Sequence, residues 1–253
     1  MSESYSLLID QGNTHLKTAH FFADQDIRTI TPKYTTPEEL DLLVSQAKDV
    51  YVCSVQSDEQ IQVLLAKIKQ QKENCHLVSS QQQAFGLVNS YQTVSNMGSD
   101  RWMGIVAGHF LTHQDFLVID AGTAITIDAV VNKHHLGGWI TAGIETAKAA
   151  LLKNTKRVFE DDSVLHKVNF GQDTSVCVTQ GAIAQAVGTV LMAVELIKSA
   201  TPEFKIIISG GNGGVIFDNL PQNIKQLAEF HPNIVLTGLA CVSVNGKLAE
   251  ESA

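Results

Sequence analysis

Hydrophobic residues along the chain form short continuous or alternating runs, separated by stretches with helical spacing, and this pattern is typical of an α/β protein. The first long helical stretch should begin at Pro37 with Thr36 as its N-cap, because proline suits the first helical turn and threonine suits the cap. The elements predicted for the first half are strands at 5–10, 15–23 and 26–31 in an antiparallel meander, a helix from Pro37, a strand at 50–55, a helix at 58–72 and a strand at 75–78.

The second half repeats this plan after a polar stretch at 79–99, which we interpret as a functional loop, and a helix at about 100–112 that joins the halves. The elements predicted beyond that helix are strands at 116–120, 135–141 and 204–209, helices at 143–153, about 175–199 and about 238–249, and a polar connection at 154–174. The chain is therefore predicted to consist of an N-terminal half at 1–112 and a C-terminal half at 113–253.

Each half opens with a hydrophobic strand that ends in an aspartate and a glycine turn. We call residues 10–14 the first acidic turn and residues 120–124 the second acidic turn. One copy would fit an aspartate that satisfies its own turn, but two matched copies predict a duplicated fold whose turns face one ligand. Backbone N–H groups in such turns bind phosphate oxygens. Because the carboxylates of Asp10 and Asp120 would repel a phosphate, a cation such as Mg²⁺ should lie between them.

Composition narrows the range of partners. The net charge of -8 and pI near 5.5 argue against nucleic acid or an anionic membrane as the main partner. The 4 cysteines are scattered, and His109 and His113 lack the glutamate of a zinc-binding HExxH helix, so no zinc site is expected. A polar, acidic N-terminus and the lack of an apolar run near the roughly 18 residues of a membrane span predict a cytoplasmic protein.

A charged segment, Gly98-Ser99-Asp100-Arg101, precedes the helix at about 100–112. An aspartate there is commonly a helix cap, and an arginine there is commonly solvated. Alternatively, the aspartate accepts a proton from an alcohol during phosphoryl transfer, and the arginine holds a substrate carboxylate. The local sequence favours neither interpretation.

Two glycine-rich stretches follow later in the chain, Gly137-Gly138-Trp139-Ile140-Thr141-Ala142-Gly143 and Ser209-Gly210-Gly211-Asn212-Gly213-Gly214. The first leads into a helix N-terminus, where anions bind well. The second follows a buried strand, where glycines let a nucleotide lie against the backbone, although a plain turn fits nearly as well.

Taken in order, these motifs resemble those of type III pantothenate kinases, in the superfamily of acetate and sugar kinases, heat-shock chaperones and actin. The resemblance runs from Asp10 to at least Gly211, which is most of the chain. It rests on the sets Asp-x-Gly-Asn-Thr-x-x-Lys at 10–17, Gly-x-Asp-Arg-Trp at 98–102, Asp-x-Gly-Thr-Ala-x-Thr-x-Asp at 120–128, Gly-Gly-x-Ile at 137–140 and the late Gly-Gly after a strand.

The resemblance implies a duplicated ribonuclease-H-like α/β fold, with ATP between the halves, that phosphorylates the primary hydroxyl of pantothenate in the first step toward coenzyme A. It implies that Asp100 is the general base, that Asp10 organises Mg²⁺, and that Asp120 binds a monovalent cation, K⁺ or NH₄⁺. It also implies a homodimer. The implied ATP-binding residues are Asp10, Gln11, Gly12, Asn13, Thr14, His15, Leu16, Lys17 and Thr123, and the implied pantothenate-binding residues are Tyr91, Gly98, Ser99, Asp100, Arg101 and Thr174.

Thr174 precedes the long helix and could equally be its N-cap. The chain has Ala142 and Asn212 where the family usually has proline and aspartate, which puts nucleotide contacts near Asn212 in doubt. A kinase for another small alcohol and a non-catalytic regulator with the same fold are the rival functions. On the long helix, Leu191, Val194, Leu196 and Ile197 could form core or a dimer face.

Overall fold

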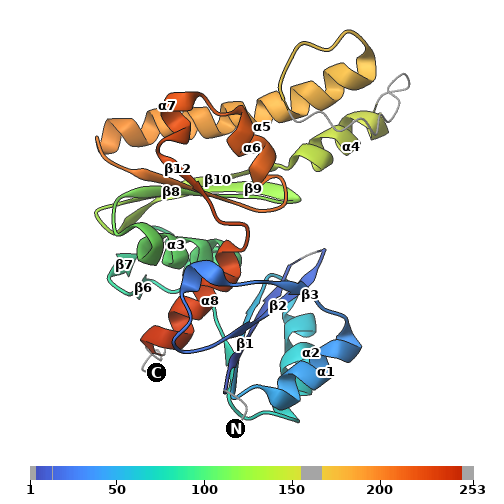
Figure 1. Ribbon diagram of the computed structural model, residues 1–253, viewed down its shortest axis with the longest axis vertical. Helices are drawn as coiled ribbons and strands as arrows, with labels where there is room; N and C mark the ends of the chain where they lie inside the picture. Colours follow the sequence, from blue (N-terminus) through green and yellow to red (C-terminus); the bar gives the residue numbers. More distant parts are fainter. Residues whose placement is uncertain (1–3, 13, 155–166, 247–253) are drawn as a thin grey trace. The chain divides into compact units, whose positions relative to one another are not determined.

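The computed structural model describes residues 4–12, 14–154 and 167–246 (Figure 1). Contacts divide the chain into unit 1, Met1–Leu111 with Asn233–Ala253, and unit 2, Thr112–Pro232. The division predicted from the sequence, 1–112 and 113–253, differs in the last segment. That segment contains helix α8 (Ile234–Asn245), which packs on strands of unit 1.

Unit 1 contains a mixed sheet with strand order β3-β2-β1-β4-β5. β1 pairs antiparallel with β2 and parallel with β4, and β4 pairs parallel with β5. Helices α1 and α2 supply Leu40, Val44 and Ile68 to a core that covers Leu7 and Ile9 of β1. The bounds are β1 Ser6–Gln11, β2 Leu16–Phe21, β3 Lys33–Tyr34, β4 Asp49–Ser54, β5 Cys75–Leu77, α1 Pro37–Gln46 and α2 Asp58–Lys69.

The start of α1 confirms the predicted cap. Thr36 Oγ1 accepts a hydrogen bond from Glu39 N at 3.3 Å, and Glu39 Oε2 accepts one from Thr36 N at 3.0 Å. This reciprocal capping box satisfies two backbone donors at the helix end. The predicted strand at 26–31 is wrong. Residues Ile27–Thr29 form a 3-10 helix, because Asp26 Oδ1 accepts from Arg28 N at 2.9 Å and closes a turn that competes with strand pairing.

Helix α8 covers β1 and β4 and begins four residues before the predicted start at about 238. Its residues from Ile234 to Val242 are all buried, so it has no solvent-exposed side in this part of its length. At Gly238 it crosses α3 (Ser99–Thr112) so closely that a Cβ atom would collide with the Met103 carbonyl oxygen. The glycine therefore permits the tight packing of α3 and α8.

Unit 2 repeats the sheet of unit 1. Its strands run in the order β12-β11-β8-β9-β10, in which β8 pairs antiparallel with β9 and parallel with β11. The same relation holds for β1 with β2 and β4, so both units have the ribonuclease-H-like arrangement and the duplicated fold is confirmed. The bounds are β8 Phe116–Ala121, β9 Ala124–Val131, β10 His134–Ala142, β11 Lys205–Ser209, β12 Ala228–Phe230, α4 Ile144–Asn154, α6 Gly213–Asn219 and α7 Gln222–Lys225.

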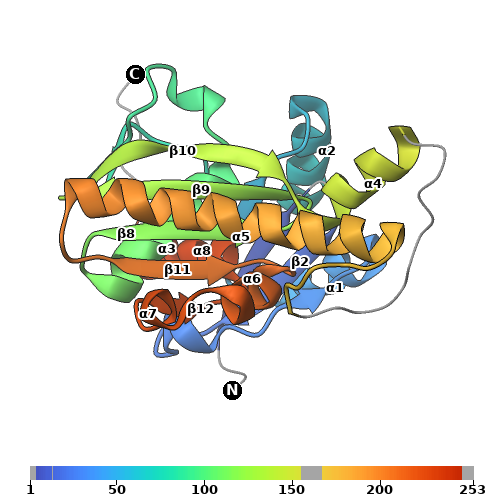
Figure 2. The same cartoon turned by 90° about the horizontal axis from the view of Figure 1, so that it is seen from above.

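The long helix α5 (Thr174–Ala200) lies along the strands of unit 2 (Figure 2). By length and composition it could cross a membrane, contrary to the expectation of no such stretch. However, Val190 and Val194 are completely buried in the core that α5 forms with β8 and β9. We therefore interpret α5 as the core helix of unit 2.

Candidate active site

The first acidic turn connects β1 to β2 in unit 1. Gly12 N donates to His15 O at 3.0 Å and closes the turn, while Asp10 stays half-buried at the strand end. The end of β4 holds this turn, because Ser54 Oγ donates to Gln11 Oε1 at 2.9 Å and Gln56 Nε2 donates to Gly12 O at 2.6 Å.

The remaining predicted ATP-binding residues of this turn differ in their surroundings. Thr14 and His15 are exposed, and the His15 ring lies edge-on to Tyr34 at 5.1 Å. Leu16 packs against the unit 1 core, and Lys17 Nζ lies 5.8 Å from the centre of the Tyr34 ring. Asn13 lies outside the described residues.

The predicted base Asp100 lies in the first turn of α3. Ser99 Oγ donates to Ser54 O at 2.9 Å, so the start of this helix is attached to the same strand that holds the first acidic turn. Asp100 Oδ1 accepts from Arg101 N at 2.7 Å. The positive end of the helix dipole favours a carboxylate at this position. Gly98 is needed there, since a Cβ atom would lie 2.5 Å from Asp100 Oδ1.

The buried thiol of Cys53 is affected by two of the candidate carboxylates, Asp10 and Asp100. Burial, the charge of Asp10 and, more weakly, the charge of Asp100 raise the pKa of the Cys53 thiol, while a hydrogen bond with Ser99 opposes them. Asp10 is the register partner of Cys53 on the neighbouring strand, and Asp100 follows Ser99, to which the thiol donates at 3.3 Å, so both carboxylates lie near Cys53. This is the central geometric fact of the candidate site in unit 1.

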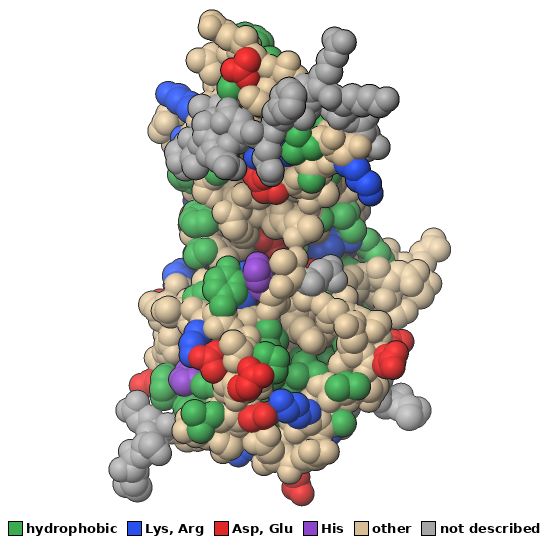
Figure 3. Space-filling model, turned by 90° about the vertical axis from the view of Figure 1, so that its right-hand side faces the viewer, with side chains coloured by type: hydrophobic (Ala, Val, Ile, Leu, Met, Phe, Trp, Pro, Cys, Tyr) green, Lys and Arg blue, Asp and Glu red, His purple; other side chains and the backbone are tan. Residues whose placement is uncertain are grey.

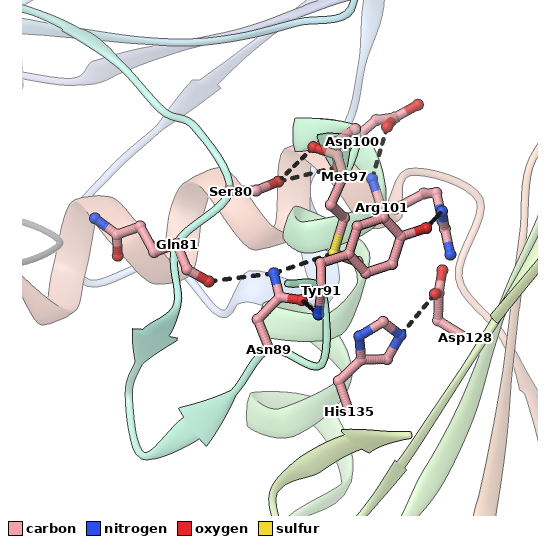
Figure 4. A network of polar contacts seen from close by, with 10 residues as sticks. Ser80, Gln81, Asn89, Tyr91, Met97, Asp100, Arg101, Asp128 and His135 are labelled. Atoms are coloured by element: carbon pink, nitrogen blue, oxygen red, sulfur yellow. Dashed lines mark hydrogen bonds and ion pairs between the residues drawn. The ribbon is translucent and has the colours of Figure 1, made fainter. Parts of the chain in front are cut away.

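Arg101 is buried and not solvated, so the simple surface interpretation of this residue is wrong. Its Nη1 donates to the Tyr91 hydroxyl at 2.7 Å, and its guanidinium lies 5.6 Å from the centre of the Tyr91 ring (Figure 4). The buried Asn89 holds the tyrosine, because its Oδ1 accepts from Tyr91 N at 3.0 Å while its Nδ2 donates to Gln81 O at 3.2 Å. Sequence reasoning missed Asn89.

The polar stretch at 79–99, which we interpret as a functional loop, supplies Asn89 and Tyr91. It contains the short hairpin strands β6 (Gln83–Ala84) and β7 (Leu87–Val88) and a 3-10 helix at Val94–Asn96. A cleft of about 760 Å³ lies beside it and is lined by residues at or just beyond the ends of β4 and β5 and around the start of α3, among them Ser54, Val55, Ser80, Gly98 and Ser99.

The second acidic turn connects β8 to β9 in unit 2. Gly122 N donates to Ala124 O at 2.9 Å, and Asp120 stays half-buried. The turn also supports the start of α4, because Thr123 O accepts from Gly143 N at 3.0 Å and from Thr146 Oγ1 at 2.6 Å. Gly143 therefore packs closely against this turn, and a Cβ atom on it would collide with the Gly122 carbonyl oxygen.

The second glycine run also reaches this turn. Gly210 has a φ of +84°, and a Cβ atom on it would lie 2.5 Å from both Asp120 Oδ1 and Ala121 O. Asn212 N donates to Ala121 O at 2.9 Å. Gly137 does not take part, because it pairs with Ala129 of β9, several residues along the strand from the turn. It lies at a register shift of β10 and has a φ of +117°. In the same sheet, the buried pair His135 Nε2 and Asp128 Oδ1 are 2.9 Å apart (Figure 4).

Thr174 is the first residue of α5 but not its cap. The N-cap is Asp173, whose Oδ1 accepts from Val176 N at 3.0 Å and from Ser175 Oγ at 2.7 Å. These hydrogen bonds lower the pKa of the Asp173 carboxyl. The N-cap interpretation of Thr174 is wrong, and its hydroxyl does not perform that task.

A cation at either acidic turn would need ligands from its substrate. Among the described residues there is no group of three or more histidine, cysteine or acidic side chains that could hold a metal alone. Single carboxylates such as Asp10 and Asp120 suit a hard cation that keeps phosphate oxygens or water as further ligands. The cysteines are free, so no disulfide links the chain.

Comparisons with known proteins identify the family of this chain. The family described as type III pantothenate kinase matches residues 6–196. A type III pantothenate kinase from Pseudoalteromonas atlantica is 33% identical over 94% of this chain and 98% of its own length.

Solved structures share the fold at lower identity. A Campylobacter jejuni protein assigned to the Baf family of transcriptional activators has a TM-score of 0.59 at 22% identity and covers 94% of this chain and 98% of its own. A Sinorhizobium meliloti protein described as a 2-dehydro-3-deoxygalactonokinase has a TM-score of 0.59 at 13% identity and covers 98% of this chain and 99% of its own. By the family match and the identity of its curated relatives, this chain belongs to the type III pantothenate kinase family.

Proposed function

We propose that this chain transfers the γ-phosphate of ATP to the primary hydroxyl of pantothenate, and that Asp100 accepts the hydroxyl proton. The product is 4′-phosphopantothenate, and the reaction is the first step of coenzyme A biosynthesis. The observation that carries the assignment of residues is the position of Asp10 and Asp100 around one buried side chain, Cys53. One carboxylate for the cation and one for the alcohol are what a phosphoryl transfer requires.

Residues 10–17 are proposed to bind the phosphates of ATP. Asp10 would hold Mg²⁺ together with phosphate oxygens, and the bound ion would neutralise charge on the transferring group. The turn N–H groups would contact the phosphates directly, and Lys17 would add positive charge. Leu16 contributes only backbone, since its side chain packs against the core.

Asp100 is proposed to take the proton as the alcohol attacks the γ-phosphate. Phosphoryl transfer passes through a loose transition state, so positioning and charge neutralisation account for most of the catalysis. The role of Gly98 is to leave room for the Asp100 carboxylate.

Arg101 and Tyr91 are proposed to bind the carboxylate of pantothenate. Arginine presents its N–H groups in a planar fork that matches a carboxylate. The hydrogen bond from Arg101 to the Tyr91 hydroxyl fixes the orientation of this fork. Thr174 is proposed as a further pantothenate contact.

In unit 2, Asp120 is proposed to bind K⁺ or NH₄⁺ and Thr123 to contact ATP. Gly210 supports this role of Asp120, because any larger residue would press on its carboxylate. The replacement of the family's usual aspartate by Asn212 leaves the backbone hydrogen bond to Ala121 in place.

A homodimer is proposed to form through the exposed side of α5 and β10. A groove of about 420 Å³ is lined there by Leu136, Trp139, Ala193 and Leu196. Leu136 and Leu196 are 54% and 55% exposed, whereas Val194 and Ile197 of the same helix as Leu196 are core residues. Sedimentation of the Leu196→Glu variant should show monomers if this surface is the interface. A dimer of unchanged stability in that variant would show that this surface is not the dimer interface.

The proposed location is the cytoplasm, where ATP and pantothenate are available, with neither nucleic acid nor membrane as a partner. On the face shown in Figure 3, acidic and basic side chains among the described residues are intermixed, and no continuous basic area is seen there.

A substrate screen with purified protein tests the proposed function. ADP release should depend on pantothenate and not on other small alcohols such as glycerol or simple sugars. Mass spectrometry should show one phosphate added to pantothenate for each ADP formed. A preference for another alcohol would assign a different kinase activity, and lack of ADP release with every alcohol would favour a non-catalytic regulator.

A further inference from the structure

Cys53 is a completely buried residue near the end of β4 to which the proposed reaction gives no role. It is the register partner of Asp10 on the neighbouring parallel strand. Its Sγ donates to Ser99 Oγ at 3.3 Å, and Ser99 is the residue before the proposed base. Cys53 therefore lies between the strand of the first acidic turn and the helix that carries Asp100.

Ser99 uses its hydroxyl within the protein. The hydroxyl hydrogen is donated to Ser54 O at 2.9 Å, and the oxygen accepts from the Cys53 thiol. A serine hydroxyl has one donor, so this donor is not available to pantothenate in the same arrangement. The side chain of Ser99 thus connects α3 to β4, and only its backbone is left to line the substrate site.

The next residue of β4 extends the connection to the phosphate-binding turn. Ser54 accepts from Ser99 through its carbonyl and donates through its own hydroxyl to Gln11 Oε1 at 2.9 Å. A continuous chain of hydrogen bonds therefore runs from Cys53 through Ser99 and Ser54 to Gln11. It begins beside the proposed base and ends beside the residue proposed to organise the cation.

We propose that Cys53 and Ser99 are positioning residues that fix the separation between Asp10 and Asp100. The inference rests on the proposed function, since it assigns these carboxylates to the cation and the alcohol. A misplacement of about 1 Å between reacting groups can lower turnover on the order of 100-fold, so a connection of this kind affects the rate of transfer more than substrate binding.

The burial and small size of Cys53 suit this role. The thiol is completely buried and donates to Ser99 Oγ at 3.3 Å, so the geometry uses it as a neutral donor. A neutral thiol fills the space between two carboxylates without adding a third negative charge.

Steady-state kinetics of substituted proteins test the proposal. The Ser99→Ala variant should lower kcat by about 10-fold or more while KM for ATP stays within about 2-fold, because the loss affects alignment of the reacting groups. The Ser99→Thr variant retains a hydroxyl and should recover most of kcat. A residue with only a structural role would not produce this separation of kcat from KM together with rescue by threonine.

Cys53 is tested with the Cys53→Val variant, which removes the thiol donor but keeps a buried apolar side chain, and with Cys53→Ser, which restores a donor. We expect a fall in kcat of about 3- to 10-fold for valine and partial recovery for serine, since one weak hydrogen bond is lost or replaced. Cys241→Ser, at another buried cysteine of unit 1, is the matched control and should retain wild-type kcat.

Thermal unfolding of each variant shows whether it is folded. If Ser99→Ala does not fold, the kinetics of Cys53→Val test the proposal instead. Folded Ser99→Ala or Cys53→Val protein with wild-type kcat overturns the inference and leaves the proposed function intact. A wild-type protein that does not phosphorylate pantothenate overturns both.

Discussion

Asp10 on β1 and Cys53 on β4 are register partners in adjacent parallel strands, and the Asp10 charge is one of the causes that raise the pKa of the Cys53 thiol. The relationship places a thiol that stays protonated directly beside the proposed cation ligand. It also connects a feature of the site to a measurable property of the whole protein, its stability at alkaline pH.

Stability should decline above about pH 8.5, where thiols of the unfolded chain ionise. Burial raises the pKa of Cys53 and raises that of Cys241 to about 12, so the folded state keeps protons that the unfolded state releases. The free energy of unfolding is then constant below the unfolded pKa and falls as pH rises, by up to about 1.4 kcal/mol per pH unit for each thiol.

Urea unfolding between pH 7 and 10 checks this slope. Cys53→Ser and Cys241→Ser should each flatten it, and Cys177→Ser, at an exposed cysteine, is the control. Parallel curves for the wild type and Cys53→Ser would contradict the assignment of Cys53 as a thiol held neutral by the fold.

Gly210 should not tolerate a side chain. Its φ of +84° disfavours other residues, and a Cβ atom would meet Asp120 Oδ1 and Ala121 O. Gly210→Ala is expected to lower the free energy of unfolding by about 1–3 kcal/mol and to reduce kcat by displacing Asp120. Gly211→Ala is the matched control, because open space surrounds its Cβ position. Equal stability and activity in the two variants would argue against a role for this contact.

The crossing of α3 and α8 predicts a second contrast between glycines. Gly238→Ala forces a methyl group onto the Met103 backbone and should destabilise the protein by about 1–3 kcal/mol. Gly188 is exposed on α5 and has open space around its Cβ position within one chain, so Gly188→Ala should stabilise the monomer by about 0.5–1 kcal/mol because alanine favours the helix. Denaturant midpoints measure both. Destabilisation by Gly188→Ala would show that the space around Gly188 is occupied by another group.

The proposed cation site predicts a dependence on monovalent ions. Turnover should be supported by K⁺ or NH₄⁺ and only weakly by Na⁺, and Asp120→Asn should lose this discrimination because a neutral amide attracts a cation less strongly. Initial rates in each chloride salt at constant ionic strength provide the measurement. Equal rates of the wild type in all three salts would contradict the assignment of a monovalent-cation site to Asp120.

The sequence was sufficient for the duplicated architecture. Asp10 and Asp120 each end a hydrophobic run and precede a glycine, and the structure places both at equivalent strand ends. The sequence also predicted the start of α1, because proline, Thr36 and Glu39 act on neighbours within one helical turn. Signals of this kind are local, and tertiary contacts did not reverse them.

Other features could not be predicted from the hydrophobic pattern alone, because they depend on side-chain hydrogen bonds or on contacts between distant segments. The apolar alternation at 26–31 favoured a strand, but the Asp26 side chain captures a backbone N–H and produces a 3-10 helix. Helix α8 is apolar throughout its buried part, so its pattern could not show that it covers the sheet of unit 1. The hydrogen bond from Tyr91 N to Asn89 Oδ1 is local, since the two residues are two positions apart, but the burial of Asn89 and its hydrogen bond to Gln81 O depend on how the loop folds.

Phosphoryl transfer by the Asp100→Asn variant tests the central claim most directly. Asparagine preserves the size of the side chain but cannot accept the alcohol proton as a carboxylate does. Formation of 4′-phosphopantothenate should fall by about 100-fold or more, within the range usual for loss of a general base, while calorimetry shows unchanged binding of ATP. Wild-type turnover by the folded Asp100→Asn protein would contradict the account.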